Sequence, residues 1–236
     1  MKEQKDTHAD DLKQFTPARI QVGRTGTRPL TKDALSFRID HAAAVDSVYG
    51  EVEDSLLAKL GLFSIDTRYE SKENYLKRPD HGRLLSDKGQ KCLLEHCEMA
   101  PQVQIVISDG LSASAVEANI MDVYRALKDS LDSYGLKTGT SFFLKGGRVG
   151  CMDAIGELLQ PEAFVLLIGE RPGLVSAESL SAYMCYKPRK GTKESSRMVV
   201  SNIHRSGTPP LEAAAHIGTL IHKMLEQKTS GVKLVV

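Results

Sequence analysis

The alternation of strands and helices between residues 103 and 169 limits the possible folds of this chain more than any other feature. Apolar runs typical of buried strands occur at 103–108 (VQIVIS), 141–147 (SFFLKGG) and 163–169 (AFVLLIG). The first two runs are separated by a segment whose apolar residues have helical spacing, namely Val116, Ile120, Val123, Leu127 and Leu131. A shorter helix with Cys151 and Ile155 on one face precedes the third run. This order predicts the α/β class, with a parallel sheet wrapped by helices.

The segments on either side of this unit extend the prediction. The alternating run at 179–186 (SLSAYMCY) predicts a fourth strand, and a last helix is expected from Thr208-Pro209-Pro210 to a point before Gly231. The spacing of Leu35, Ile39 and Val45 predicts a helix over 31–61. We therefore expect a flexible tail over 1–17, a mostly helical region over 18–100 and the α/β domain over 101–236.

The composition argues against several classes of partner. The 236 residues carry a net charge of +1, so no broad basic field is offered to nucleic acid or to an acidic membrane surface. No apolar run reaches the roughly 18 residues of a membrane span, and the first residues lack the apolar stretch of a secretory signal. Four cysteines are too few for a disulfide scaffold, and the segment 92–97 has no second pair of zinc ligands. We expect a reducing compartment and no metal site.

Polar and flexible residues follow each of the three strands. In parallel sheets, ligands bind beyond the carboxyl ends of the strands, and here those ends are Ser108-Asp109-Gly110, Gly146 to Val149 and Gly169 to Gly173. The charged or polar residues expected at this rim are Asp109, Arg148, Asp153, Glu170, Arg171, Asn202 and His204. No GxSxG elbow and no GxGxxG turn is present. The residues alone leave three interpretations open: catalysis, ligand binding, or ion pairs that hold the loops.

Stretches that span nearly the whole chain from residue 18 onward resemble one family. They are ARIQVGRTGTRPLT at 18–31, RPDHGRLLS at 78–86, VQIVISDGLSASAVEAN at 103–119, GRVGCMDAIGEL at 147–158, LLIGERPGLVSAESLSAYMCY at 166–186, SNIHRSGTPPLEAAAHI at 201–217 and KTSGVKL near the end. The combination of LIGERPGL with SNIHxxGxPPxEAA is highly specific. The chain is therefore similar to the small (light-chain) subunit of ethanolamine ammonia-lyase.

The resemblance implies an activity, a cofactor and a partner. The family's enzyme uses adenosylcobalamin, which contains cobalt, to convert ethanolamine to acetaldehyde and ammonia. A large subunit built on a TIM barrel holds the substrate and carries the radical chemistry, so no catalytic residue is expected in this chain. The small subunit contributes a Rossmann-like, cobalamin-facing domain, here 101–236, and shares the cofactor with the large subunit. The resulting heterodimers assemble into a larger oligomer.

Carried over by position, the family's cobalamin contacts fall on Val149, Glu170 and Val199. Family members can have Cys where this chain has Val199, and a main-chain contact would survive that change whereas a thiol contact would not. The DxHxxG motif of other cobalamin proteins is absent, because Asp40-His41 and Asp80-His81 are adjacent pairs. This agrees with the family's binding mode, in which the cofactor keeps its own dimethylbenzimidazole as lower ligand.

The resemblance implies a cytoplasmic protein, packaged in many family members in a bacterial microcompartment. About 17 residues precede the matching region here, and so short a segment makes a marginal helix, which leaves packaging open. The rivals are a stand-alone hydrolase that uses Asp109, Cys151 or His204, and a stand-alone α/β binding module for a nucleotide-like ligand.

Overall fold

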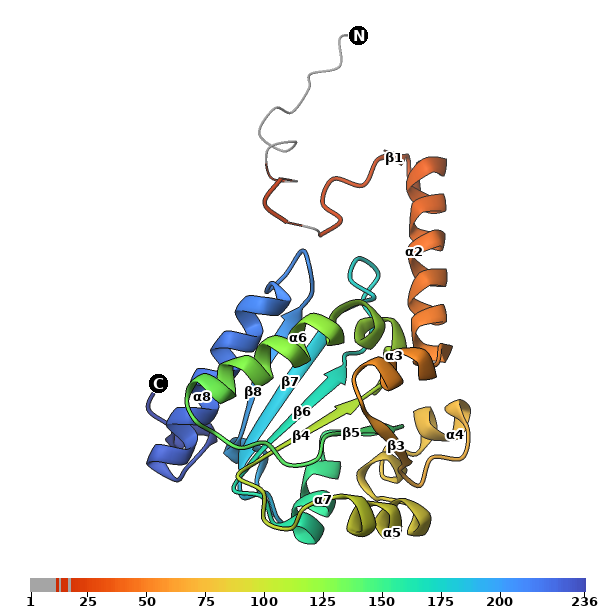
Figure 1. Cartoon of the computed structure of the whole chain (residues 1–236). Coiled ribbons are helices and arrows are strands. Elements are labelled where there is room, and N and C mark those ends of the chain that lie inside the picture. Colours follow the sequence, from red (N-terminus) through yellow and green to blue (C-terminus); the bar gives the residue numbers. More distant parts are fainter. Residues whose placement is uncertain (1–11, 13, 17) are drawn as a thin grey trace.

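The structure is a computed structural model that describes residues 12, 14–16 and 18–236. The tail predicted over 1–17 therefore lies almost entirely outside the described residues. One six-stranded sheet forms the centre of the chain, with helices packed on both faces (Figure 1). No helix of the described residues is long and apolar enough to cross a membrane.

The sheet has the strand order β3-β5-β4-β6-β7-β8. Its strands are β3 (Phe63–Asp66), β4 (Val103–Ser108), β5 (Phe142–Lys145), β6 (Ala163–Gly169), β7 (Leu180–Tyr186) and β8 (Arg197–Ile203). The pairs β5–β4 and β4–β6 are parallel, as the sequence predicts. The pair β3–β5 is parallel too, although β3 was not predicted. The pairs β6–β7 and β7–β8 are antiparallel. The α/β class is confirmed, but the sheet is mixed and not wholly parallel.

The connection after β6 explains why the sheet does not continue as a parallel sheet beyond β6. Residues 170–179 join β6 to β7 without a helix, and a parallel connection needs a crossover of about a dozen residues or more. The chain therefore turns back beside β6. The next connection contains only the short helix η2 (Glu194–Ser196) and leads into β8, a strand that the sequence did not predict.

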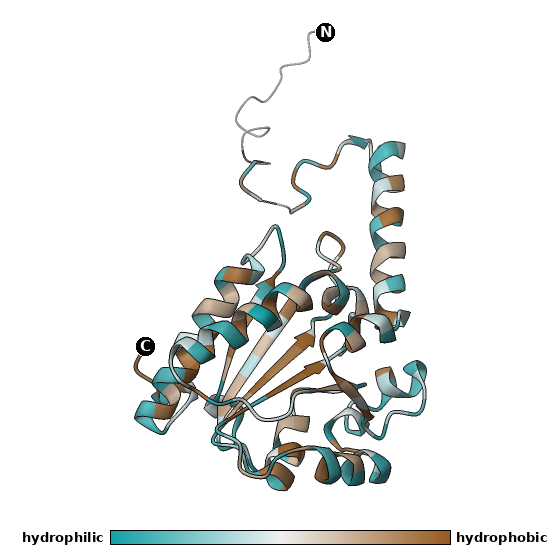
Figure 2. Cartoon of the chain, viewed as in Figure 1, coloured by the Kyte–Doolittle hydropathy of each residue, from teal (hydrophilic) through white to brown (hydrophobic). Residues whose placement is uncertain are grey.

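Two helices cover each face of the sheet. On one face, α6 (Ala113–Ser133) and α8 (Pro210–Gln227) pack against β4, β6 and β7 (Figure 1). On the other face, α5 (Asp87–His96) and α7 (Cys151–Leu159) cover β5, β4 and β6. The central strands are hydrophobic along their length, while the helices turn hydrophilic residues outward (Figure 2). Burial on both faces is the physical reason for the apolar runs in the sequence.

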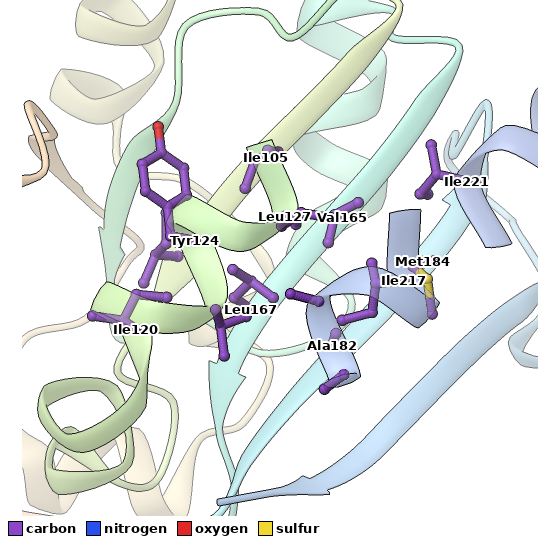
Figure 3. Packing of buried hydrophobic residues seen from close by; sticks show 14 of the residues in the cluster. Ile105, Ile120, Tyr124, Leu127, Val165, Leu167, Ala182, Met184, Ile217 and Ile221 are labelled. Carbon is purple, nitrogen blue, oxygen red and sulfur yellow. The ribbon is translucent and has the colours of Figure 1, made fainter. Parts of the chain in front are cut away.

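The helix α6 follows the predicted pattern closely. Its five predicted apolar positions are all buried, and Ile120 and Leu127 meet Val165, Leu167 and Ile217 in the core (Figure 3). Ser112 caps its first turn, because the Ser112 hydroxyl accepts a hydrogen bond from the Ala115 amide at 3.0 Å.

In α8, Pro210 is the first helical residue and Pro209 the cap, so the helix begins slightly later than predicted.

The helix predicted over 31–61 is two helices, α2 (Thr31–Tyr49) and α3 (Asp54–Lys59), separated at Gly50 by extended backbone. The helix α2 projects away from the sheet (Figure 1), and Ile39 on its apolar stripe is 68% exposed. Before it, β1 (Arg24–Thr25) and β2 (Arg28–Pro29) form a small ribbon. After α3 come β3, α4 (Lys72–Lys77) and the short helix η1 (His81–Arg83), and η3 (Gly231–Lys233) lies near the end.

The strand β3 belongs to the region predicted as mostly helical, yet it pairs with β5 in the central sheet. The sheet therefore draws strands from both sides of residue 100. The division into parts at 18–100 and 101–236 stays a prediction.

The face of the sheet under α6 is expected to control stability. Leu127→Ala removes a fully buried side chain and should lower the free energy of unfolding by about 2–5 kcal/mol. Leu211→Ala is the matched control, because Leu211 is also helical but 61% exposed, and it should change stability by less than about 1 kcal/mol. Urea unfolding followed by circular dichroism measures both, and equal losses would contradict the packing described.

Candidate functional site

The loops that follow β4, β5 and β6 meet at one edge of the sheet around an open hollow of about 340 Å³. We call it the edge hollow. Its lining includes Gly110, Val149, Glu170, Ser181, Tyr183 and Ser201. A second hollow of about 860 Å³, here called the α7 hollow, lies at the start of α7 and shares Arg148 and Val149 with the first. The two hollows therefore adjoin at these two residues. The edge hollow lies at the carboxyl ends of the parallel strands, where α/β sheets bind ligands.

The three residues singled out from the sequence lie in this neighbourhood. Val149 and Glu170 line the edge hollow directly. Val199 does not line it, but on β8 it pairs across the sheet with Tyr183, which does. Directly paired residues present their side chains on the same face of a sheet. Val199 is 51% exposed on that face, next to the lining residue Tyr183.

The carboxylate of Glu170 is held in a fixed orientation. Its Oε1 atom accepts hydrogen bonds from the Ser181 hydroxyl at 2.6 Å and from the backbone amide of Asn202 at 2.8 Å. Asn202 has φ +60°, a left-handed conformation that Asn tolerates better than most residues. Among the described residues, every hydrogen bond of this carboxylate uses Oε1. The other oxygen is therefore available to accept a hydrogen bond from a ligand.

The loop that carries Val149 is fixed by four hydrogen bonds. The Gly146 amide donates to Asp109 Oδ1 at 2.8 Å, and the Gly147 amide donates to the Ser108 hydroxyl at 3.0 Å. The Tyr75 hydroxyl donates to the Gly147 carbonyl at 2.8 Å, and the amide of the next residue, 148, donates to the Gly82 carbonyl at 2.8 Å. A Cβ on Gly147 would lie 2.6 Å from the Ser108 hydroxyl oxygen, so only glycine permits this approach.

A buried ion pair lies beneath this loop. Lys72 Nζ is 3.8 Å from Asp109 Oδ2, and both side chains are more than nine-tenths buried. Burial raises the pKa of Asp109, and the Lys72 ammonium opposes that rise. Burial likewise lowers the pKa of Lys72, and Asp109 opposes that fall. Sequence analysis found Asp109 but missed Lys72 and Tyr75, because both occur in a charged segment with no motif to mark them.

The residues of the hydrolase hypothesis are not brought together. Cys151 is fully buried, and burial raises its pKa to about 12, so its thiol is not activated as a nucleophile. Asp109 is buried in its ion pair. His204 lines a separate hollow, where its Nε2 lies 2.8 Å from Asn202 Oδ1. Of the other rim residues, Asp153 pairs with Arg197 at 2.7 Å beside the α7 hollow.

The fold and this edge define an α/β protein with a mixed sheet, in which fixed loops surround an open hollow. Comparison with known proteins makes the assignment specific. A family model described as ethanolamine ammonia-lyase light chain (EutC) matches residues 6–235. The chain belongs to this family, and the lyase resemblance inferred from its motifs is confirmed.

Individual relatives agree with the family model. A protein named ethanolamine ammonia-lyase small subunit from Clostridium tetani is 49% identical over 223 residues, which cover 94% of this chain and 76% of the relative. Proteins of the same name from Fusobacterium nucleatum and Listeria monocytogenes are 48% and 46% identical over 222 and 223 residues. Both alignments cover 94% of this chain, and they cover 75% and 76% of the relatives.

Removing Lys72 from the buried pair should make the free energy of unfolding depend more strongly on pH. In Lys72→Met, burial still raises the pKa of Asp109 and no ammonium opposes it. A raised pKa in the folded state favours folding below the unfolded pKa, and that stability is lost as pH rises through the folded pKa. The variant should therefore lose about 3–5 kcal/mol of unfolding free energy at pH 8 and distinctly less at pH 5.

Urea unfolding at the two pH values tests this expectation. Lys77→Met is the control, because Lys77 is an exposed lysine of the same helix. A Lys72→Met deficit that is the same at both pH values, or no larger than that of the control, would show that the pair is not coupled.

Proposed function

We propose that this chain binds adenosylcobalamin jointly with a large subunit and so completes ethanolamine ammonia-lyase, which converts ethanolamine to acetaldehyde and ammonia. One observation supports this most strongly. Val149 and Glu170, which lie 21 positions apart in the sequence, line the same hollow, and Val199 pairs across the sheet with Tyr183 of its lining. These are the positions at which the family resemblance places cobalamin contacts.

The residues of the hollow fit the chemistry of this cofactor. Cobalamin carries amide side chains and a nucleotide with ribose hydroxyls, which are hydrogen-bond donors. Glu170 offers an oriented acceptor, and its neighbours Ser181 and Ser201 line the same hollow. Val149, Tyr183 and Val199 offer apolar contact surface. The valine at 199 supports a main-chain or apolar contact there and removes any thiol contact.

The size of the depression supports a shared site. Ligand sites usually bury most of the ligand surface, and hollows of about 340 and 860 Å³ that open to solvent leave one side of so large a cofactor uncovered. The name small subunit implies a large partner that can cover the other side. We therefore place the cofactor between the two chains.

In this arrangement the chain binds the cofactor, and the large subunit carries out the reaction. When bound, adenosylcobalamin supplies an organic radical by homolytic cleavage of its cobalt–carbon bond. This chain's residues bind and orient: Glu170 accepts hydrogen bonds, and Val149 and Val199 exclude water from the surface they cover. Substrate binding and radical chemistry are assigned to the large subunit.

Reconstitution tests the proposal. The purified chain is mixed with the large subunit, adenosylcobalamin and ethanolamine, and acetaldehyde is assayed, with each chain alone as control. Product should form only in the mixture. Product from this chain alone would place an active site here and overturn the proposal. A folded complex that forms no product and binds no cobalamin would favour an unrelated binding module.

Variants of Glu170 test the cofactor contact. Glu170→Ala removes a charged acceptor worth roughly 1.5–3 kcal/mol, so cobalamin affinity of the complex should fall about 10- to 100-fold. Glu170→Gln keeps an oxygen for Ser181 and Asn202 but removes the charge, and a smaller loss is expected. Glu212→Gln, an exposed residue at the start of α8, is the control. Binding followed by the cobalamin absorbance measures each, and unchanged affinity in both Glu170 variants would contradict the assignment.

A further inference from the structure

Arg148 and its neighbour Val149 line both hollows, and Arg148 is the charged residue of the two. We infer that Arg148 binds an anionic group of the ligand, and that under the proposed function this group is the phosphodiester of the cobalamin nucleotide. The inference rests on that proposed function and adds a residue and a chemical group to it.

Arg148 is held in place by contacts with Tyr75 and Gly82. Its guanidinium lies 4.1 Å from the centre of the buried Tyr75 ring, a cation–π distance. A Cβ on Gly82 would lie 2.6 Å from Arg148 Cγ, so the side chain packs directly against that glycine. The Arg148 amide donates to the Gly82 carbonyl at 2.8 Å. Backbone and side chain are both positioned before any ligand binds, which lowers the entropy lost on binding.

The hydrogen-bonding capacity of this guanidinium is largely unused. A guanidinium has five N–H donors. Within the described part of the chain it makes one hydrogen bond, from Nη2 to the Tyr75 carbonyl, and that bond is long at 3.4 Å. Its Nε is buried without a partner among the same residues. A group that is so well held and so poorly satisfied is suited to a ligand with several acceptor oxygens.

The charge of Arg148 is also uncompensated. The ion pairs of the described residues do not include it. Asp109, the buried carboxylate behind the loop, is already engaged by Lys72 and by the Gly146 amide. Glu170 lines the same hollow but uses Oε1 for Ser181 and Asn202.

The neighbouring cations narrow the choice of ligand group. On the side of the α7 hollow, Arg197 is paired with Asp153 and with Glu194. Arg83 and Lys190 also line the α7 hollow, but among the described residues Arg148 is the one cation that lines both hollows. A phosphodiester, with one negative charge and two equivalent oxygens, matches a guanidinium that can donate two parallel hydrogen bonds.

The test compares ligands with and without the phosphate on the assembled complex of this chain with the large subunit. Cobalamin, cobinamide phosphate and cobinamide, which lacks phosphate, ribose and base, are titrated by absorbance against wild type and Arg148→Met. The variant should bind cobalamin and cobinamide phosphate about 10- to 100-fold more weakly, because a charge-assisted contact is lost. Its affinity for cobinamide should stay within about twofold.

Arg171→Met is the matched control, because Arg171 lines the same hollow but is exposed. It should leave the ratio of cobalamin to cobinamide affinity unchanged. Gel filtration establishes that each complex assembles, and Arg148→Gln replaces Arg148→Met if the latter does not. An equal loss for all three ligands, or no loss for any, would overturn the role of Arg148. Wild-type complex that binds no cobalamin would instead overturn the proposed function, and this inference with it.

Discussion

The buried carboxylate of Asp109 is the group on which the arrangement of the edge hollow depends. It stands at the end of β4, accepts the amide of Gly146 at the end of β5, and faces Lys72 from α4. Three separate parts of the chain are thereby tied together at one point. Moving a charge from water into the protein interior costs free energy, and an opposite charge together with hydrogen bonds offsets that cost. The pair therefore ties the loop after β4 to α4 and to the end of β5.

Other contacts at the edge extend the same arrangement outward. The Tyr75 hydroxyl fixes Gly147, and the Tyr75 ring supports the guanidinium of Arg148. Both contacts come from α4, an element of the first hundred residues. The loop that carries Val149 is thus positioned by residues distant in sequence. Without their contacts, its conformation would be less restricted. Preorganisation of this kind lets a binding residue act without reordering when a ligand arrives.

The antiparallel end of the sheet supplies the opposite wall. Because β7 returns beside β6 without a crossover, Ser181 comes close enough to hold Glu170, and Tyr183 pairs with Val199. A wholly parallel sheet would have placed a helix between these segments. The mixed topology thus joins the loop after β6 to the face of β8, where Val199 is exposed.

The sequence by itself determined the centre of the molecule. The runs at 103–108 and 163–169 and the spacing from Val116 to Leu131 predict β4, β6 and α6, because local patterns of burial repeat with the period of each element. Family motifs also placed Val149, Glu170 and Val199, although their roles remain proposals. Tertiary structure alone decided the antiparallel strands, the exposure of α2 and the contacts that Lys72 and Tyr75 make beneath the loop at Arg148. The physical reason is that these depend on contacts between segments far apart in the chain, and such contacts leave no periodic mark in the sequence.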